Sequence, residues 1–174
     1  MIALLQTRLR DHLDQALAPL KLLGQSPQGD VVTAPKVFIG DVPPKRHKKG
    51  HETAGGSGVI YEVPCVVIVP LTGHMEVVDG AAAGVVTLAL CLSVYNPDKG
   101  ERADTEEVEA DLAVLLSAVS GALLPCAQGV PLAKRFVLTP DEKGRTLMWV
   151  RAEDQPKPFS AVTITSRWWF KGWE

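Results

Sequence analysis

The residues best suited to hold a metal ion are two histidines and a glutamate in the first third of the chain. His47 and His51 stand four residues apart, and Glu52 follows directly. In the H-E-x-x-H zinc motif the glutamate stands between the histidines on a helix. Here the three residues stand in a Lys- and Gly-rich segment, with no third ligand spaced nearby. The sequence therefore predicts no metal site and no cofactor.

Patterns for nucleophilic or phosphate chemistry are also incomplete. The Gly-rich residues 55–58 lack the lysine and the helix of a Walker loop, and no serine stands in a G-x-S-x-G elbow. Cys65, Cys91 and Cys126 are far apart, without an adjacent base that would make a thiolate. We expect Cys65 and Cys91 to be small core residues. The sequence predicts no catalytic residue and a protein that is not an enzyme.

The strongest charge feature is a basic run made by Lys45, Arg46, Lys48 and Lys49. The chain as a whole carries a formal net charge of -2, which does not favour a dedicated nucleic-acid binder. Two interpretations stay open. The run is a solvated loop, or it contacts something acidic, either a DNA backbone or an acidic protein. Residues 45–58 are predicted to form a long flexible loop, because their composition cannot bury apolar area.

Large aromatic residues gather at the C-terminal end, as Trp168, Trp169, Phe170 and Trp173. Adjacent residues of a strand point to opposite faces. Trp168 and Trp169 should therefore point opposite ways, with at least one exposed in an isolated subunit. Because exposed large aromatics mark interaction surfaces, we place Trp168 and Trp169 in a candidate subunit or partner interface.

These side chains must be positioned by a sheet whose centre is predicted at residues 85–95. Alternate residues there are apolar, which indicates a strand with one face on a core. A dense turn signal at residues 96–100 precedes a helix predicted from about Asp104 to Leu124, with Pro125 ending it. The apolar stripe of that helix is expected to cover the apolar face of the strand.

The remaining elements complete one domain over residues 1–174. An amphipathic helix is predicted from Ile2 to near Pro19, packed on its own sheet or on a neighbouring subunit. Residues 59–71 should pair antiparallel with residues 85–95, through a turn at 72–74, a hairpin arm at 75–78 and a flexible tip at 79–84. Later strands are predicted at residues 135–138, 145–151 and 161–170, with a turn at 139–144. The fold class is α+β, with a mainly antiparallel, mixed sheet flanked by an N-terminal and a central helix.

We expect no membrane partner, because no apolar run approaches the roughly 20 residues that span a bilayer. The opening residues lack the basic region of a secretory signal. An odd cysteine count without such a signal fits reduced thiols in a cytosol.

Three segments, taken in order, resemble one family. They are residues 39–46, residues 63–71 coupled to residues 86–96, and residues 149–159 followed by a strand ending in aromatics. Together they resemble the small tail-terminator or tail-completion proteins of long-tailed phages and prophages. The resemblance runs from about Val37 to Trp169, and residues 153–159 are its most specific part.

The resemblance implies a structural protein of the virion neck, assembled in the host cytoplasm. Members form a ring, commonly a hexamer, that caps the tail tube and joins it to the head-tail connector protein. The implied partners are further copies of the chain, the tail tube protein and the connector, with passive contact to DNA in the channel. The basic run would face that channel or the acidic rim of a neighbouring ring. The longer Gly-rich insertion after Lys49 departs from the family, which leaves the role of the loop open.

The segment at residues 153–159 suits a subunit contact. Its two prolines lower the entropy lost on docking, its acidic pair could meet a basic partner, and Phe159 offers an apolar anchor. The residues assigned to this interface are Glu153, Asp154, Pro156, Pro158 and Phe159. The alternative is a loop between strands with structural prolines. Rival functions are a head-completion or head-tail connector protein, and a small cytosolic nucleic-acid-binding domain whose tryptophans stack bases.

Overall fold

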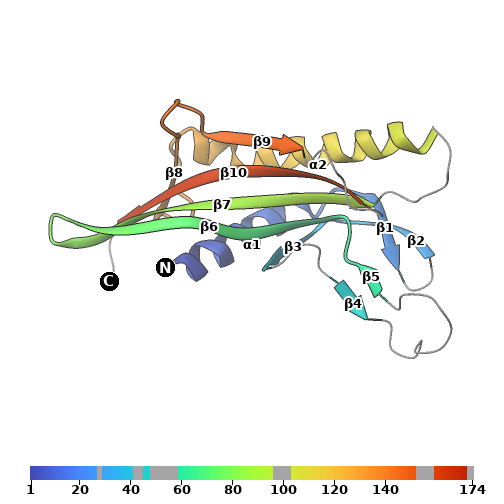
Figure 1. Ribbon diagram of the computed structural model, residues 1–174, viewed down its shortest axis with the longest axis horizontal. Coiled ribbons are helices and arrows are strands. Elements are labelled where there is room, and N and C mark those ends of the chain that lie inside the picture. Colours follow the sequence, from blue (N-terminus) through green and yellow to red (C-terminus); the bar gives the residue numbers. More distant parts are fainter. Residues whose placement is uncertain (27–28, 41–44, 48–58, 96–102, 152–158, 172–174) are drawn as a thin grey trace.

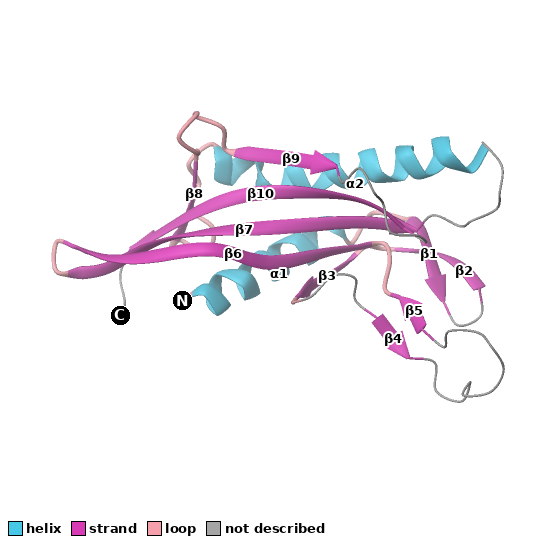
Figure 2. Ribbon diagram, viewed as in Figure 1, coloured by secondary structure: helices cyan, strands magenta, loops and turns pink. Residues whose placement is uncertain are grey.

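The computed structural model of this chain describes residues 1–26, 29–40, 45–47, 59–95, 103–151 and 159–171. They form an α+β fold with a mixed, mostly antiparallel sheet, as predicted (Figures 1 and 2). In chain order the elements are α1 (Ile2–Leu17), β1 (Leu22–Ser26), β2 (Gly29–Thr33), β3 (Lys36–Ile39), β4 (Lys45–His47), β5 (Val59–Tyr61), β6 (Cys65–Val78), β7 (Ala81–Tyr95), α2 (Ala103–Ala127), β8 (Phe136–Thr139), β9 (Leu147–Arg151) and β10 (Phe159–Lys171).

The main sheet has six strands, and β7 lies near its middle. The strand order is β3-β6-β7-β10-β8, with β9 also pairing with β10. Only β3 and β6 pair in parallel; the other pairs of this sheet are antiparallel. Leu92 of β7 stands opposite Val66 of β6 and Val162 of β10. The predicted antiparallel pairing of the two long strands is confirmed.

One face of the sheet is covered by both helices. The predicted apolar face of β7 is buried here, as Val86, Leu88, Leu90, Leu92 and Val94. Four leucines of α1 at a spacing of four residues have no exposed surface; they are Leu5, Leu9, Leu13 and Leu17. The helix α2 contributes Leu112, Leu115, Val119 and Leu123 to the same core. Since burying a leucine side chain stabilises a fold by roughly 1.5–3 kcal/mol, α1 belongs to its own sheet.

The opposite face of the sheet is covered by no helix in the described chain (Figure 2). At one end a smaller apolar cluster, Val63, Cys65, Val67 and Tyr95, packs with Leu23 of β1. Beyond it the face carries half-exposed side chains, among them Thr87, Cys91, Thr163, Thr165 and Trp169. We call this surface the open face.

The hairpin of β6 and β7 is longer than predicted and projects past the helices (Figure 1). Residues 72–74 were predicted to turn, but they continue β6 after an irregularity in pairing between Pro70 and Thr72. Residues 81–84 were predicted to be flexible, but they pair within β7. The chain turns at Asp79 and Gly80 alone, where φ is 54° and 78°. Two positive φ values are typical of a two-residue hairpin turn. We call residues 69–84 the arm.

Two further boundaries differ from the prediction. The helix α2 runs through Pro125 to Ala127, because a proline in the last turn removes a single donor from the hydrogen-bond ladder. Residues 45–47, at the start of the predicted loop, form the short strand β4, which pairs antiparallel with β5. Residues 48–58, with His51 and Glu52, lie outside the described residues.

Candidate functional site

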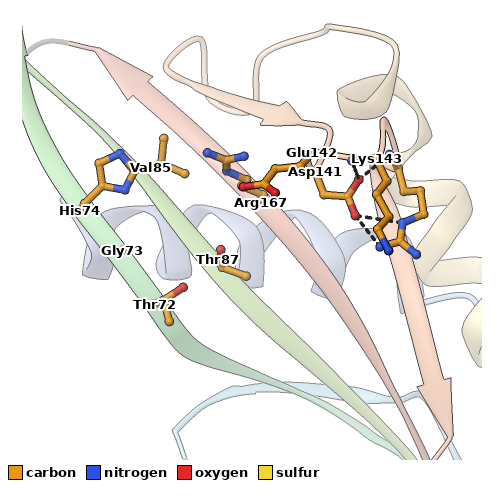
Figure 3. Close-up of a pocket in the computed structure, with 10 residues that line it drawn as sticks. Thr72, Gly73, His74, Val85, Thr87, Asp141, Glu142, Lys143 and Arg167 are labelled. Atoms are coloured by element: carbon orange, nitrogen blue, oxygen red, sulfur yellow. Dashed lines mark hydrogen bonds and ion pairs between the residues drawn. The ribbon is translucent and has the colours of Figure 1, made fainter.

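A polar pocket of about 460 Å³ lies on the open face at the base of the arm (Figure 3). Its floor follows a row of residues across three strands. Thr72 of β6 stands opposite Thr87 of β7, which stands opposite Arg167 of β10. The turn between β8 and β9, residues 141–145, forms one wall, and His74 lies on the other side of the floor.

The wall is held in shape by one carboxylate, that of Asp141. Its Oδ1 accepts hydrogen bonds from the backbone N–H groups of Lys143 and Arg145, both at 2.8 Å. Its Oδ2 accepts from the Arg145 guanidinium, at 2.9 Å from Nε and 2.7 Å from Nη2. These bonds favour the charged form and lower the pKa of Asp141. Asp141 is therefore occupied as a structural acceptor of the turn.

Arg167 lies on the pocket floor and carries a charge that is unpaired among the described residues. Its guanidinium makes no hydrogen bond or ion pair with a described residue, whereas Glu142 reaches toward it from the wall (Figure 3). His74 likewise has no hydrogen-bonded carboxylate or hydroxyl among the described residues. The Arg167 guanidinium on the floor is suited to bind an anionic group. A guanidinium fork is the group that binds carboxylates in two contacts.

A second kind of surface is apolar and lies at the sheet's edges. Two of the most exposed large side chains are Trp149 at 62% and Val150 at 64%, neighbours on β9. On the arm, Leu71, Met75 and Val77 are 53%, 57% and 77% exposed. Monomeric proteins normally protect the edges of their sheets, so both edges are candidate contact surfaces.

The predicted interface at the C-terminal strand is only partly available. Trp168 has no exposed surface, and its Nε1 donates to Ser166 Oγ at 3.0 Å inside the core. The structure therefore removes Trp168 from the predicted interface, because its face of β10 is the one that the helices cover. Trp169 points to the open face and is half-buried. The prediction that the two tryptophans point opposite ways is confirmed.

The other predicted site residues lie partly in described strands and partly outside the described residues. Lys45 and Arg46 belong to β4, whereas Lys48 and Lys49 lie outside the described residues. Phe159 begins β10 opposite Tyr95. The rest of that predicted interface, Glu153, Asp154, Pro156 and Pro158, also lies outside the described residues.

The sequence interpretation missed Arg167 and Trp149 as surface residues. Arg167 had a detectable signal, since it follows Thr163 and Thr165 on the polar side of an alternating strand. Trp149 had none, because its exposure depends on β9 being the last strand of the sheet there, which only the topology reveals.

Cys65 fits the predicted core role, whereas Cys91 is only partly buried on the open face and packs against the small apolar cluster. Burial raises the pKa of Cys65 to about 12 and also raises that of Cys91, so both thiols are protonated at neutral pH. No group of three or more metal-ligating side chains occurs in the part of the chain that the structure describes.

One helix of the described chain differs from the expectation that no apolar run is long enough to span a bilayer. Residues Glu109–Ala127 of α2 are long and apolar enough to cross a bilayer by length and composition. In the fold, one side of this segment packs on the sheet through Leu112, Leu115, Val119 and Leu123, while Val114 and Leu124 on its outer side are exposed.

No protein-family model matches this chain, and no curated protein matches it.

Proposed function

We propose that the protein is a ring-forming structural protein of the neck of a long-tailed phage, of the tail-terminator kind. Its ring caps the tail tube and joins the tail to the head connector. The proposal begins from the resemblance of the three segments described above. That resemblance implies a compact fold with a mainly antiparallel sheet flanked by helices, and the fold of this chain has such a sheet and helices.

The observation that carries the proposal is a sheet that, among the described residues, is left open at both edges and on one face. Five large apolar side chains, Leu71, Met75, Val77, Trp149 and Val150, are more than half exposed along those edges. Exposed apolar surface marks sites of protein contact. Exposure at two separate places suits heterologous, head-to-tail contacts, which generate a ring when the rotation between copies closes. The function rests on fit between copies and with the tube end, and needs no reaction.

The proposal is tested with purified tail tubes that lack a terminator, incubated with the full chain and viewed by electron microscopy. We expect a ring at one end of each tube and a mass in solution that is a multiple of the subunit mass. Filled heads without tails are the control, because a head-completion protein would bind them instead. A protein that binds heads and leaves tube ends bare would replace the tail-terminator role with that of a connector.

A further inference from the structure

An apolar cavity of about 410 Å³ opens where the start of α1 meets the arm. Val86 and Phe170 are buried beneath it, and the ring of Phe170 is held edge-on against Phe136 at a centroid distance of 6.2 Å. Ile2 and Met75, which are 42% and 57% exposed, contribute to its lining. The cavity is therefore a fixed apolar hollow with an accessible rim, which is suited to an apolar side chain from outside.

The strand beside this cavity has a free edge. β3 pairs with β6 over residues 65–68 only, and no other described strand pairs with that side of β6. Along residues 69–78, every second residue therefore directs its backbone N–H and C=O away from β7 without a strand partner. An added strand would satisfy those groups and bring side chains over the cavity.

The opposite edge of the same sheet carries the exposed tryptophan. β9 pairs with β10 on one side and with no other described strand. Trp149 stands opposite Ile164, a residue of the helix-covered face. Two residues further on, Arg151 reaches α2, where its Nη1 donates to Glu109 Oε2 at 2.6 Å. The indole of Trp149 therefore lies on the helix side of the sheet, and so does the cavity, whose Val86 and Phe170 belong to the same core.

From this match we infer that β9 of one copy adds to the free β6 edge of the next, and that Trp149 enters the apolar cavity there. When one sheet continues into another, side chains keep their face. A tryptophan on the helix side of β9 thus arrives on the helix side of the neighbouring arm. The occupant of the cavity is a second copy of this chain, because the projecting side chain and the hollow lie at opposite edges of one sheet. The inference rests on the proposed ring and specifies the contact that builds it.

The strand directions agree with a closed ring. Within the chain, β9 runs antiparallel to β10, as do β7 to β10 and β6 to β7, so β9 and β6 have opposite directions. Rotation about an axis along the strands preserves direction, so β9 meets the next copy's β6 antiparallel. Thr165 of β10 stands opposite Met148 of β9 on one side and opposite Ala89 of β7 on the other. Ala89 in turn stands opposite Val69 of β6, so Met148 and Val69 lie at the same height in the sheet. Pairing with residues 69–78 therefore shifts β9 along the strand, as the tilt of closed sheets requires.

The test uses two variants of the full chain, Trp149→Glu and Met75→Glu. Each places a charge on one half of the contact and leaves the other half intact, and both side chains are exposed, so the fold should survive. We expect mass photometry to show oligomers of the wild type. Each variant should have a dissociation constant that is higher by about tenfold or more. Because the contact is heterologous, mixing the variants leaves one intact pairing, between Trp149 of the Met75→Glu chain and the cavity of the Trp149→Glu chain. The mixture should form heterodimers and no rings.

Val130→Glu is the matched control, since Val130 is 56% exposed and lies in neither edge; it should associate like the wild type. A wild type that stays monomeric up to its solubility limit overturns the inference. Retention of wild-type association by either variant, or a mixture without heterodimers, also overturns it. Failure of the proposed function gives a different result. If the rings depend on Trp149 but do not bind tail tubes, the contact between copies is supported and the tail-terminator role is overturned. If Trp149→Glu still forms rings that cap tail tubes, the role is supported and the contact is overturned.

Discussion

Cys65 lies in the small apolar cluster beneath β1 and has no exposed surface. Burial, with Cys91 nearby, raises its pKa from 9.0 to about 12. A thiol whose pKa is raised by folding stabilises the native state below its unfolded pKa, and that stabilisation is lost as the pH rises through the folded value. The affected window is therefore pH 9 to about 12.

We predict that the free energy of unfolding of the wild type falls more steeply above pH 9 than that of Cys65→Ala. The difference in slope should be about 1 kcal/mol per pH unit. Urea denaturation at pH 7.5, 9 and 10.5 measures it, and comparing slopes removes the constant cost of the cavity that alanine leaves. Parallel slopes would mean that Cys65 is not desolvated as the fold requires.

The two adjacent tryptophans of β10 should differ sharply in their effect on stability. Trp168→Ala removes a side chain without exposed surface and empties part of the core, which should cost about 3–5 kcal/mol. Trp169→Ala removes a half-buried ring from the open face and should cost about 1 kcal/mol. Denaturant midpoints of the two variants provide the measurement. Similar losses in both would contradict the assignment of Trp168 to the core and Trp169 to the surface.

At the scale of the elements, the arm depends on a glycine at its base. A Cβ on Gly84 would lie 2.6 Å from Cζ of Phe170 and 2.8 Å from the carbonyl oxygen of His74. Gly84→Ala should therefore displace β6 or the Phe170 ring and cost about 1–3 kcal/mol. Gly121→Ala is the matched control, because a Cβ there meets nothing within 4 Å on α2, and it should stabilise by about 0.5–1 kcal/mol. Thermal unfolding of both variants checks the pair, which should move in opposite directions.

The elements predictable from sequence are those whose pattern has a local cause. Alternation in β7 and helical spacing in α1 are set by which side of each element is buried, so their interpretation succeeded. The prediction of a turn in the arm was wrong because Thr72, Gly73 and His74 have turn-like composition. Only their pairing with residues 85–87 holds them extended. Propensity within a strand is overridden by its cross-strand partners.

At the scale of the molecule, the candidate surfaces depend on topology more than on composition. Trp149 stands in an ordinary apolar run, and nothing in that run distinguishes a central strand from an edge strand. Arg167 is a single charge in an alternating strand until Thr72 and Thr87 are aligned beside it by the register. The predicted interface relied on aromatic content instead, and it included Trp168, which the helices cover.

The outer side of α2 is the main competitor of the sheet edges as a self-association surface. No charged residue occurs between Asp111 and Lys134, and Val114 and Leu124 are 44% and 53% exposed on that helix. We predict that Val114→Lys combined with Leu124→Glu changes the free energy of unfolding by no more than about 0.5 kcal/mol, because neither side chain is in the core. The double variant should also keep the oligomeric mass of the wild type, since copies that join through β9 and the arm leave α2 outside the contact. Mass photometry and urea denaturation on the same sample separate the two effects. A stable double variant that becomes monomeric would transfer the contact between copies from the sheet edges to α2.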